Sequence, residues 1–263
     1  LQDLRFIHPS GIVVLASLAA WLSQERECRL EIIPPLNGDV QRYLSRMDFY
    51  CTLGMDVQED FRRYDAAGRF QEMVWLRQER GIDEVAAMLV QVISANICLK
   101  KSIKHSLQIS IAEVGSNVFH HGRSPIGGLI CAQKYPQKGF VELAVADCGI
   151  GIRAAMSQRY GEVRSPDSAG PALEKAIQRG TTSRPEHNSG GGLFFTTEVI
   201  RNNGGRAFIQ SERAMLVVSS QGNAVRSQPY WQGTIVCLQF ELDSEADMIS
   251  LFNHYFPPED DYG

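Results

Sequence analysis

The sequence lacks the features that mark membrane, secreted and nucleic-acid-binding proteins. Its 263 residues carry 26 Lys and Arg against 30 Asp and Glu, a formal net charge of −4, so the basic excess of a general nucleic-acid binder is missing. The longest apolar run, residues 11–22, has about 12 residues, whereas a bilayer-spanning helix needs about 20. No basic segment precedes this run, so it does not read as a signal peptide. These absences predict a cytoplasmic protein without direct membrane or nucleic-acid contacts.

Cysteine is sparse, and no two cysteines are closely spaced. The six cysteines form no C-x-x-C pair, and His120 and His121 have no such pair nearby. A disulfide framework or a structural zinc site would need clustered ligands. The spacing therefore predicts free cysteines in a reducing compartment.

Hydrophobic periodicity divides the chain into a smaller N-terminal part and a larger domain. Residues 1–75 alternate short apolar runs, at 4–7 and 30–33, with helical spacing over 12–24 and 38–50, which predicts a small α/β unit. Its last stretch, residues 56–75, is charged and poorly periodic, and we interpret it as a linker or a connection that carries a strand.

Residues 80–245 are predicted to form an α+β domain, followed by a C-terminal segment, 246–263, with an acidic tail. Helices segregated from a mixed or antiparallel sheet predict a two-layer sandwich. The expected elements are helices at 82–99, 106–121 and 193–203 and strands at 128–134, 140–147, 206–211, 214–219 and 233–242.

The first of three motifs in this domain pairs a carboxylate with an amide. In ISIAEVGSNVFHHG, Glu113 and Asn117 are four residues apart, which places both on one face of the predicted helix. An amide oxygen is a hard ligand suited to Mg²⁺, and a carboxylate beside it can position a water or hydroxyl nucleophile. The alternative is the exposed polar face of an amphipathic helix.

The second motif, Asp147-Cys148-Gly149-Ile150-Gly151, comes at the end of an alternating strand. A carboxylate there can accept a hydrogen bond from an exocyclic amine, and the two glycines let the backbone approach a flat ring closely. The alternative is an ordinary glycine-rich turn between a strand and a helix.

The third motif, Asn188-Ser189-Gly190-Gly191-Gly192-Leu193, leads into a predicted helix. Backbone N–H groups at a helix N-terminus favour anions, which suits a di- or triphosphate. Residues 180–187 before it lack apolar periodicity and are interpreted as a flap. The alternative is a flexible linker.

In order, spacing and structural context, the three motifs resemble the GHKL ATPase superfamily, which includes sensor histidine kinases, type II topoisomerases, mismatch-repair ATPases and bacterial anti-sigma-factor serine kinases. The resemblance covers residues 82–243 and implies the Bergerat sandwich, with ATP or ADP and Mg²⁺ bound between the helices and a lid. The compact domain and the phrase RGTTSRPEHNSGGGL are most similar to the serine-kinase branch.

The resemblance implies a role for each matching residue. Glu113 matches the general base and Asn117 the Mg²⁺ ligand. Asp147 matches the acceptor of the adenine amine, and Thr234 in GTIVCLQF matches the threonine that supports it through water. The other expected nucleotide contacts are Gly149, Gly151, Thr181, Thr182, Gly190, Gly191, Gly192 and Leu193.

The N-terminal part resembles the STAS fold of anti-sigma-factor antagonists but lacks the leading strands expected of a complete STAS domain. In FIHPSGI, Ser10 stands where those proteins carry a phosphorylatable serine, although His8-Pro9 replaces the acidic residue and its neighbour. Ser10 is therefore a predicted phospho-acceptor, with a helix N-cap as the alternative. The resemblance also implies a protein partner, namely a STAS-type antagonist, a sigma-like factor or a second copy of the chain in a homodimer.

Two classes of function follow from the resemblance. In the first, the chain is a Mg-dependent ATPase or serine/threonine kinase, in which Glu113 takes the proton of a water or serine hydroxyl. In the second, the chain has no catalytic activity, and nucleotide orders the segment 161–192 to expose or hide a surface for a protein partner. A STAS-like scaffold is a further form of the second class. Hydrolase and kinase share every one of these residues.

Overall fold

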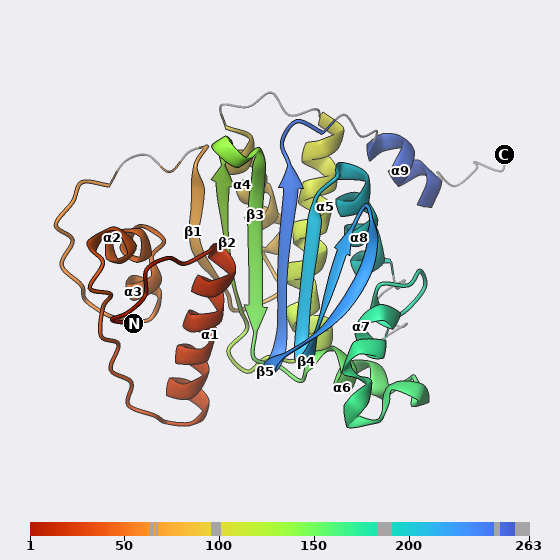
Figure 1. Cartoon of the computed structure of the whole chain (residues 1–263), viewed down its shortest axis with the longest axis horizontal. Coiled ribbons are helices and arrows are strands. Elements are labelled where there is room, and N and C mark those ends of the chain that lie inside the picture. The colour runs from red at the N-terminus through yellow and green to blue at the C-terminus, as the bar shows by residue number, and fades with distance from the viewer. Residues whose placement is uncertain (64–65, 67, 96–100, 183–190, 245–247, 256–263) are drawn as a thin grey trace.

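The computed structural model describes residues 1–63, 66, 68–95, 101–182, 191–244 and 248–255. Within them the chain is a mixed α+β protein whose five antiparallel strands form one sheet in the order β1-β2-β3-β5-β4 (Figure 1). The strands are β1 (Phe70–Leu76), β2 (Gly128–Tyr135), β3 (Phe140–Asp147), β4 (Arg206–Ser219) and β5 (Gly222–Glu241). The helices are α1 (Pro9–Glu25), α2 (Gly38–Arg46), α3 (Phe49–Thr52), α4 (Ile82–Ser94), α5 (Lys101–Asn117), α6 (Gly151–Ser157), α7 (Ala169–Ala176), α8 (Gly192–Asn203) and α9 (Met248–Tyr255).

Helices α4, α5 and α8 cover one face of the sheet and form the main core (Figure 1). On α5, Leu107, Ile111 and Val114 recur at helical spacing and are almost fully buried. They pack in one cluster with alternate residues of β3, Leu143 and Val145. The segregation of these helices onto one face of an antiparallel sheet, as the sequence predicted, positions the C-terminal end of α5 beside the end of β3.

Helix α1 covers the other face of the sheet, over β2 and β3 (Figure 1). Its Ile12, Val13 and Ala16 are buried in one cluster with small residues of the sheet, including Cys131 and Ala144. The sequence predicted a half-buried β3 and a domain of two layers. With α1 included, the molecule has three layers, and β3 is buried on both faces because the second set of its alternating residues packs against α1.

Both strands expected in the N-terminal part were predicted wrongly. Residues 4–7 and 30–33 form no strand, and a backbone hydrogen bond from Leu36 to Gln2 joins the two segments only near their ends. A short apolar run carries no pairing information, and Pro34-Pro35 removes backbone donors directly after the second run. Among the described residues before β1, the regular elements are therefore the helices α1, α2 and α3. β1 itself lies almost entirely within the expected connection.

Two strands of the C-terminal hairpin are longer than expected. The strands predicted at 206–211 and 214–219 are one strand, β4, whose register shifts around Glu212 at a φ of 53°. Such a bulge interrupts the alternation without ending the strand. Strand β5 begins at Gly222 rather than at 233, and its first part is exposed.

A buried carboxylate lies beneath the start of α1. Glu142 of β3 is 2 % exposed and accepts hydrogen bonds from the Ser10 hydroxyl at 3.4 Å and the Gln239 amide at 3.1 Å. Nδ1 of His8 lies 3.6 Å from the same carboxylate. The N-cap of α1 is His8 rather than Ser10, so the capping role considered for Ser10 was predicted wrongly. The hydroxyl instead contacts the sheet.

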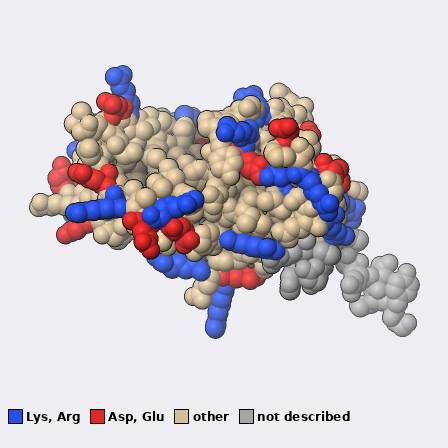
Figure 2. Space-filling view, turned by 90° about the horizontal axis from the view of Figure 1, so that it is seen from below, with Lys and Arg blue, Asp and Glu red and all other residues tan. Residues whose placement is uncertain are grey.

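The outer surface mixes charges of both signs. In the view of Figure 2, Lys and Arg side chains alternate with Asp and Glu side chains, and neither sign forms a broad patch on the described residues of that face. No helix in the described ranges combines the length and the apolar character needed to cross a bilayer.

Candidate functional site

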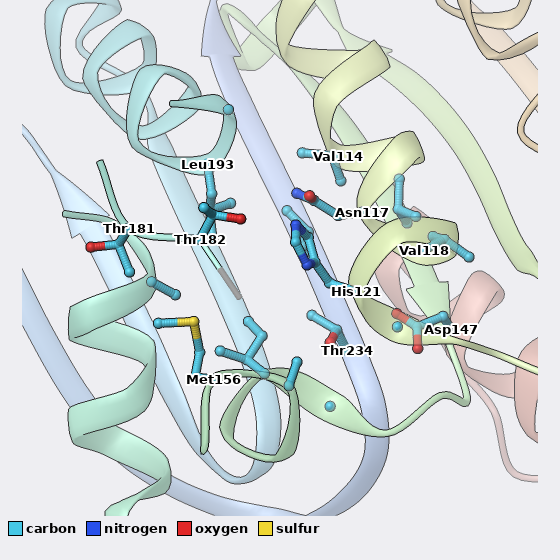
Figure 3. Close-up of a pocket in the computed structure, with 18 residues that line it drawn as sticks. Val114, Asn117, Val118, His121, Asp147, Met156, Thr181, Thr182, Leu193 and Thr234 are labelled. Atoms are coloured by element: carbon cyan, nitrogen blue, oxygen red, sulfur yellow. The ribbon is translucent and has the colours of Figure 1, made fainter. Parts of the chain in front are cut away.

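A pocket opens on the α5 face of the sheet, where α5, α6 and the start of α8 meet (Figure 3). The space between its lining residues is about 780 Å³, a volume that includes open solvent at the mouth of the pocket. Most of the residues predicted to contact a nucleotide line this pocket, although they come from five separate segments of the chain. They are Asn117, Asp147, Gly151, Thr181, Thr182, Gly192, Leu193 and Thr234.

Asp147 places a buried carboxylate in the lining of the pocket. The residue ends β3 and is 4 % exposed. Its Oδ1 accepts a hydrogen bond of 2.7 Å from the backbone N–H of Gly149. Burial raises the pKa of Asp147 to about 7, although hydrogen bonds from the backbone of Gly149 and Thr234 oppose this shift. A carboxylate with these backbone partners can still accept a hydrogen bond from a ligand.

Glycines surround this carboxylate because larger residues would not fit. A Cβ at Gly149 would collide with the Gly122 carbonyl oxygen and lie 2.9 Å from Oδ1 of Asp147. A Cβ at Gly233, whose φ is 95°, would lie 2.7 Å from the same oxygen. The Gly122 carbonyl also accepts a hydrogen bond of 2.7 Å from the N–H of Ile150. The turn after β3 is therefore tied to the end of the α5 segment.

Neighbouring side chains fix the backbone of this region. The indole Nε1–H of Trp231 donates to the Asp147 carbonyl at 3.0 Å, and the Gln232 amide donates to the Cys148 carbonyl at 3.3 Å. Thr234 follows on β5 and lines the pocket beside Asp147 (Figure 3). The middle of β5, just before the part that pairs with β3, thus holds the Asp147 turn in place.

Glu113 and Asn117, which the spacing predicted to share one helix face, both lie on the side of α5 toward the N-terminus of α8. Asn117 lines the pocket from the last turn of α5. Glu113 does not line it, but its carboxylate approaches Gly192, the first residue of α8, so closely that a Cβ there would collide with it. Burial raises the pKa of Glu113, and the interaction with His120 offsets part of this rise.

The arrangement also fits a magnesium ion bound together with phosphates. An anion at the N-terminus of α8 would face the Glu113 carboxylate, so a cation between them would be needed. The Asn117 amide offers an oxygen ligand one helical turn away. Among the described residues, no group of three or more His, Cys, Asp or Glu side chains is arranged to hold a metal by itself.

The end of α5 continues into a π-helical turn, η1 (Val118–Gly122), which carries two histidines. Nε2 of His120 lies 2.6 Å from a carboxylate oxygen of Glu79, while its Nδ1 is buried without a hydrogen-bond partner among the described residues. His121 lines the pocket next to Asn117 (Figure 3). The sequence indicated that one of the two lies near Asn117, and His121 is the one in the pocket.

Some predicted site residues lie elsewhere. Gly149 and Gly191 do not line the pocket, although Gly149 shapes the turn beneath Asp147 and the Gly191 carbonyl accepts the N–H of Phe195 in the first turn of α8. Gly190 and most of the predicted flap, residues 183–190, lie outside the described residues. Ser10 contacts the opposite face of the sheet, so its role as a phospho-acceptor stays a prediction.

Sequence reasoning missed the part of the wall that α6 provides. Ile152, Ala155 and Met156 line the pocket and recur at helical spacing directly after Gly151. That spacing could have revealed an apolar helix face toward the site. The contacts of Arg159 and Tyr160, which follow α6, with the pocket wall were also missed, because both side chains meet a backbone carbonyl, that of Thr182.

No protein-family model matches the chain, and no curated protein matches it significantly.

Proposed function

We propose that the chain binds ATP or ADP with Mg²⁺ in this pocket, in the manner of the GHKL ATPases that its motifs resemble. One observation carries the proposal. Asp147 is a buried carboxylate whose hydrogen-bond partners are backbone groups and whose surroundings are kept open by glycine, in a pocket that also contains Asn117 and the N-terminus of α8. In this proposal the α+β fold is a Bergerat sandwich.

The adenine base would occupy the end of the pocket at Asp147. Its amine would donate to the carboxylate, which is the acceptor that this end of the pocket offers a base. Val145, Ile152 and Met156 supply apolar walls for a flat ring. A buried acceptor discriminates strongly between ligands, because a base without a donor at that position would leave the carboxylate unpaired.

The phosphates would lie between Asn117 and the first residues of α8. The N–H groups and the dipole at the start of α8 favour an anion. The Glu113 carboxylate lies against Gly192 at this helix N-terminus. Asn117 would hold Mg²⁺. The positive charge of the ion would offset the repulsion between the phosphates and the Glu113 carboxylate. This places the charged part of the ligand at the end of the pocket away from Asp147.

We further propose that Glu113 is the general base, which makes the chain a Mg-dependent ATPase or serine/threonine kinase. Its half-buried carboxylate has a raised pKa, and a base works best when its pKa approaches the operating pH. A water or a serine hydroxyl of a partner protein would give up its proton to this carboxylate. The partner would be a STAS-type antagonist, a sigma-like factor or a second copy of the chain in a homodimer.

Calorimetric titration tests the binding claim. Mg-ATP and Mg-ADP are titrated into the wild type, into Asp147→Asn and into Asp167→Asn, a matched change at an exposed aspartate outside the pocket. We expect micromolar to submillimolar binding to the wild type and to Asp167→Asn. Asp147→Asn should bind about 100-fold more weakly, because its amide cannot accept as the carboxylate does. Equal affinities of all three proteins, or no binding to the wild type, would refute the proposal.

A further inference from the structure

Helix α6 is fixed to the sheet at its first turn. The Ile152 N–H donates to the Ser211 hydroxyl at 2.9 Å, and that hydroxyl donates to the Gly233 carbonyl at 2.8 Å. Nε of Arg153 lies 2.9 and 2.7 Å from the two carboxylate oxygens of Glu212. α6 begins only four residues after Asp147. These contacts therefore fix the start of the helix and the Asp147 turn in one place.

Directly after α6, two side chains donate hydrogen bonds to the same backbone carbonyl. The backbone N–H groups of Arg159 and Tyr160 both donate to the Met156 carbonyl, which extends the last turn of the helix. Nη1 of Arg159 then donates to the Thr182 carbonyl at 3.1 Å, and the Tyr160 hydroxyl donates to the same oxygen at 3.4 Å. We call Arg159 and Tyr160 the α6 clamp.

The tyrosine of the clamp is itself held in place. Nζ of Lys175 on α7 lies 4.5 Å from the centroid of the Tyr160 ring, and the same amine lies 2.9 Å from Glu162. The ring therefore has a packing role that is separate from the hydrogen bond of its hydroxyl. This separation allows the hydroxyl to be removed while the ring stays in place.

The residue that the clamp holds belongs to the pocket wall. Thr182 is 6 % exposed and lines the pocket across from Asn117 and His121, at a distance from Asp147 (Figure 3). It therefore faces the region to which we assigned the phosphates. Helix α6 and its clamp connect the two ends of the pocket, from the Asp147 turn to the wall at Thr182.

We propose that Arg159 and Tyr160 are positioning residues for the phosphate-bearing end of the nucleotide and act through the Thr182 carbonyl. This inference rests on the proposed binding of ATP or ADP. When both donors are present, the Thr182 segment of the pocket wall is fixed before the ligand binds. Binding of the phosphates then does not include the entropic cost of ordering this segment. The clamp thus sets the preference for nucleotide over nucleoside, while Asp147 sets the preference for the base.

Competition titrations with adenosine, Mg-ADP and Mg-ATP test this inference on the full chain. The variants are Arg159→Gln and Tyr160→Phe, and the controls are Arg164→Gln and Tyr230→Phe. Arg164 also donates to a backbone carbonyl, that of Ser157 at the end of α6, which does not line the pocket, and Tyr230 is 58 % exposed. We expect Mg-ADP and Mg-ATP affinity to fall about tenfold in Arg159→Gln and about threefold in Tyr160→Phe, as loss of a charged and a neutral hydrogen bond implies. Adenosine affinity should stay within about twofold of the wild type in both variants.

Three results would overturn the inference, and they have different meanings. If adenosine affinity falls by the same factor as Mg-ADP affinity, the clamp supports the whole pocket rather than its phosphate end. If no affinity changes while Asp147→Asn still weakens binding, the clamp has no role, although the proposed function stands. If the wild type binds none of the three ligands, the proposed function fails and this inference fails with it.

Discussion

Strand β3 carries a buried carboxylate near each end, one on each face of the sheet. Glu142 lies under α1 and has side-chain partners, the Ser10 hydroxyl and the Gln239 amide. Asp147 lies on the α5 face, has backbone partners in Gly149 and Thr234, and borders a pocket. The two residues are 2 % and 4 % exposed, so burial alone does not separate them.

The difference lies in what surrounds each carboxylate. Side chains from α1 and β5 pack against Glu142, and a buried polar group whose partners come from packed side chains contributes to the docking of those elements. Glycines surround Asp147, and its raised pKa reflects the cost of an ionised group at that place. We therefore expect changes on the α1 face to alter stability and changes on the pocket face to alter ligand binding or turnover.

The largest expected effect is on turnover at the pocket face. Glu113→Gln should reduce the rate of phosphate release from Mg-ATP, or of transfer to a protein serine, about 1,000-fold, because the amide cannot take a proton. Nucleotide affinity should change by less than about threefold, since in this proposal Glu113 does not contact the adenine and Mg²⁺ offsets its charge at the phosphates. Phosphate release and calorimetry on the same protein measure the two quantities.

Glu174→Gln, an exposed position on α7, is the matched control and should retain wild-type turnover. Turnover that survives Glu113→Gln would contradict the role of Glu113. A wild type that binds nucleotide but never turns it over would instead favour the nucleotide-gated switch.

The second effect concerns stability at the α1 face. Glu142→Ala should lower the free energy of unfolding by about 3 kcal/mol, because it leaves a cavity and removes the acceptor of Ser10 and Gln239. Glu142→Gln, which keeps the volume, should lower it by about 1 kcal/mol. Urea denaturation measures both changes. If Glu142→Gln lost nucleotide affinity while its stability stayed unchanged, the claim that the α1 face affects stability and not binding would be contradicted.

The pH dependence of binding gives the third effect. Asp147 has a pKa of about 7, and its protonated form is a poorer acceptor for an amine. We therefore expect nucleotide affinity to be constant above pH 8 and to fall toward tenfold per pH unit below about pH 6, a dependence that Asp147→Asn should lack. Titrations between pH 5.5 and pH 8.5 would measure this. A flat profile in the wild type would contradict the role of Asp147.

The expected loss of nucleotide affinity at low pH would not result from unfolding at Asp147. Its raised pKa weakens binding as the pH falls but stabilises the folded chain over the same range. The folded-state pKa is raised from 3.8, so the contribution of Asp147 to stability is fully present below about pH 4 and is lost as the pH rises through 7. Around pH 6 the proton on Asp147 thus favours the folded chain. Stability curves of the wild type and Asp147→Asn over this range separate the two effects.

The smallest effect is expected at Ser10. Ser10→Ala should lower the free energy of unfolding by about 1 kcal/mol, because Glu142 loses one of its donors. Nucleotide affinity should not change. Denaturation and calorimetry of the variant measure both quantities, and a decrease in affinity would contradict the separation of the two faces.

The strands that could be predicted best from the sequence are the two that flank a clear turn. β2 and β3 are long, regular and joined by a short turn, so their bounds agree closely with prediction. β1 is an edge strand whose register shifts between Gln71 and Val74, and this irregularity hid it in a charged segment. The covering of β3 by α1 could not be predicted, because periodicity shows that a helix has an apolar face but not which surface that face meets.

The candidate site could be predicted where each residue carries its own chemical signal. Asn117 follows a carboxylate by one helical turn, Asp147 ends a strand before two glycines, and Gly192 belongs to a glycine run before a helix. All three line one pocket. Met156 could not be assigned because an apolar residue in the wall resembles any core residue. Arg159 was missed for another reason, since its partner is a backbone carbonyl and no sequence pattern marks such an acceptor.

The most direct test of the account is a crystal structure of the chain with Mg-ADP. We expect the amine of adenine within hydrogen-bond distance of the Asp147 carboxylate and the phosphates between Asn117 and Gly192, while Glu142 keeps its contacts with Ser10 and Gln239. A nucleotide bound outside this pocket, or one whose base faces away from Asp147, would contradict the account.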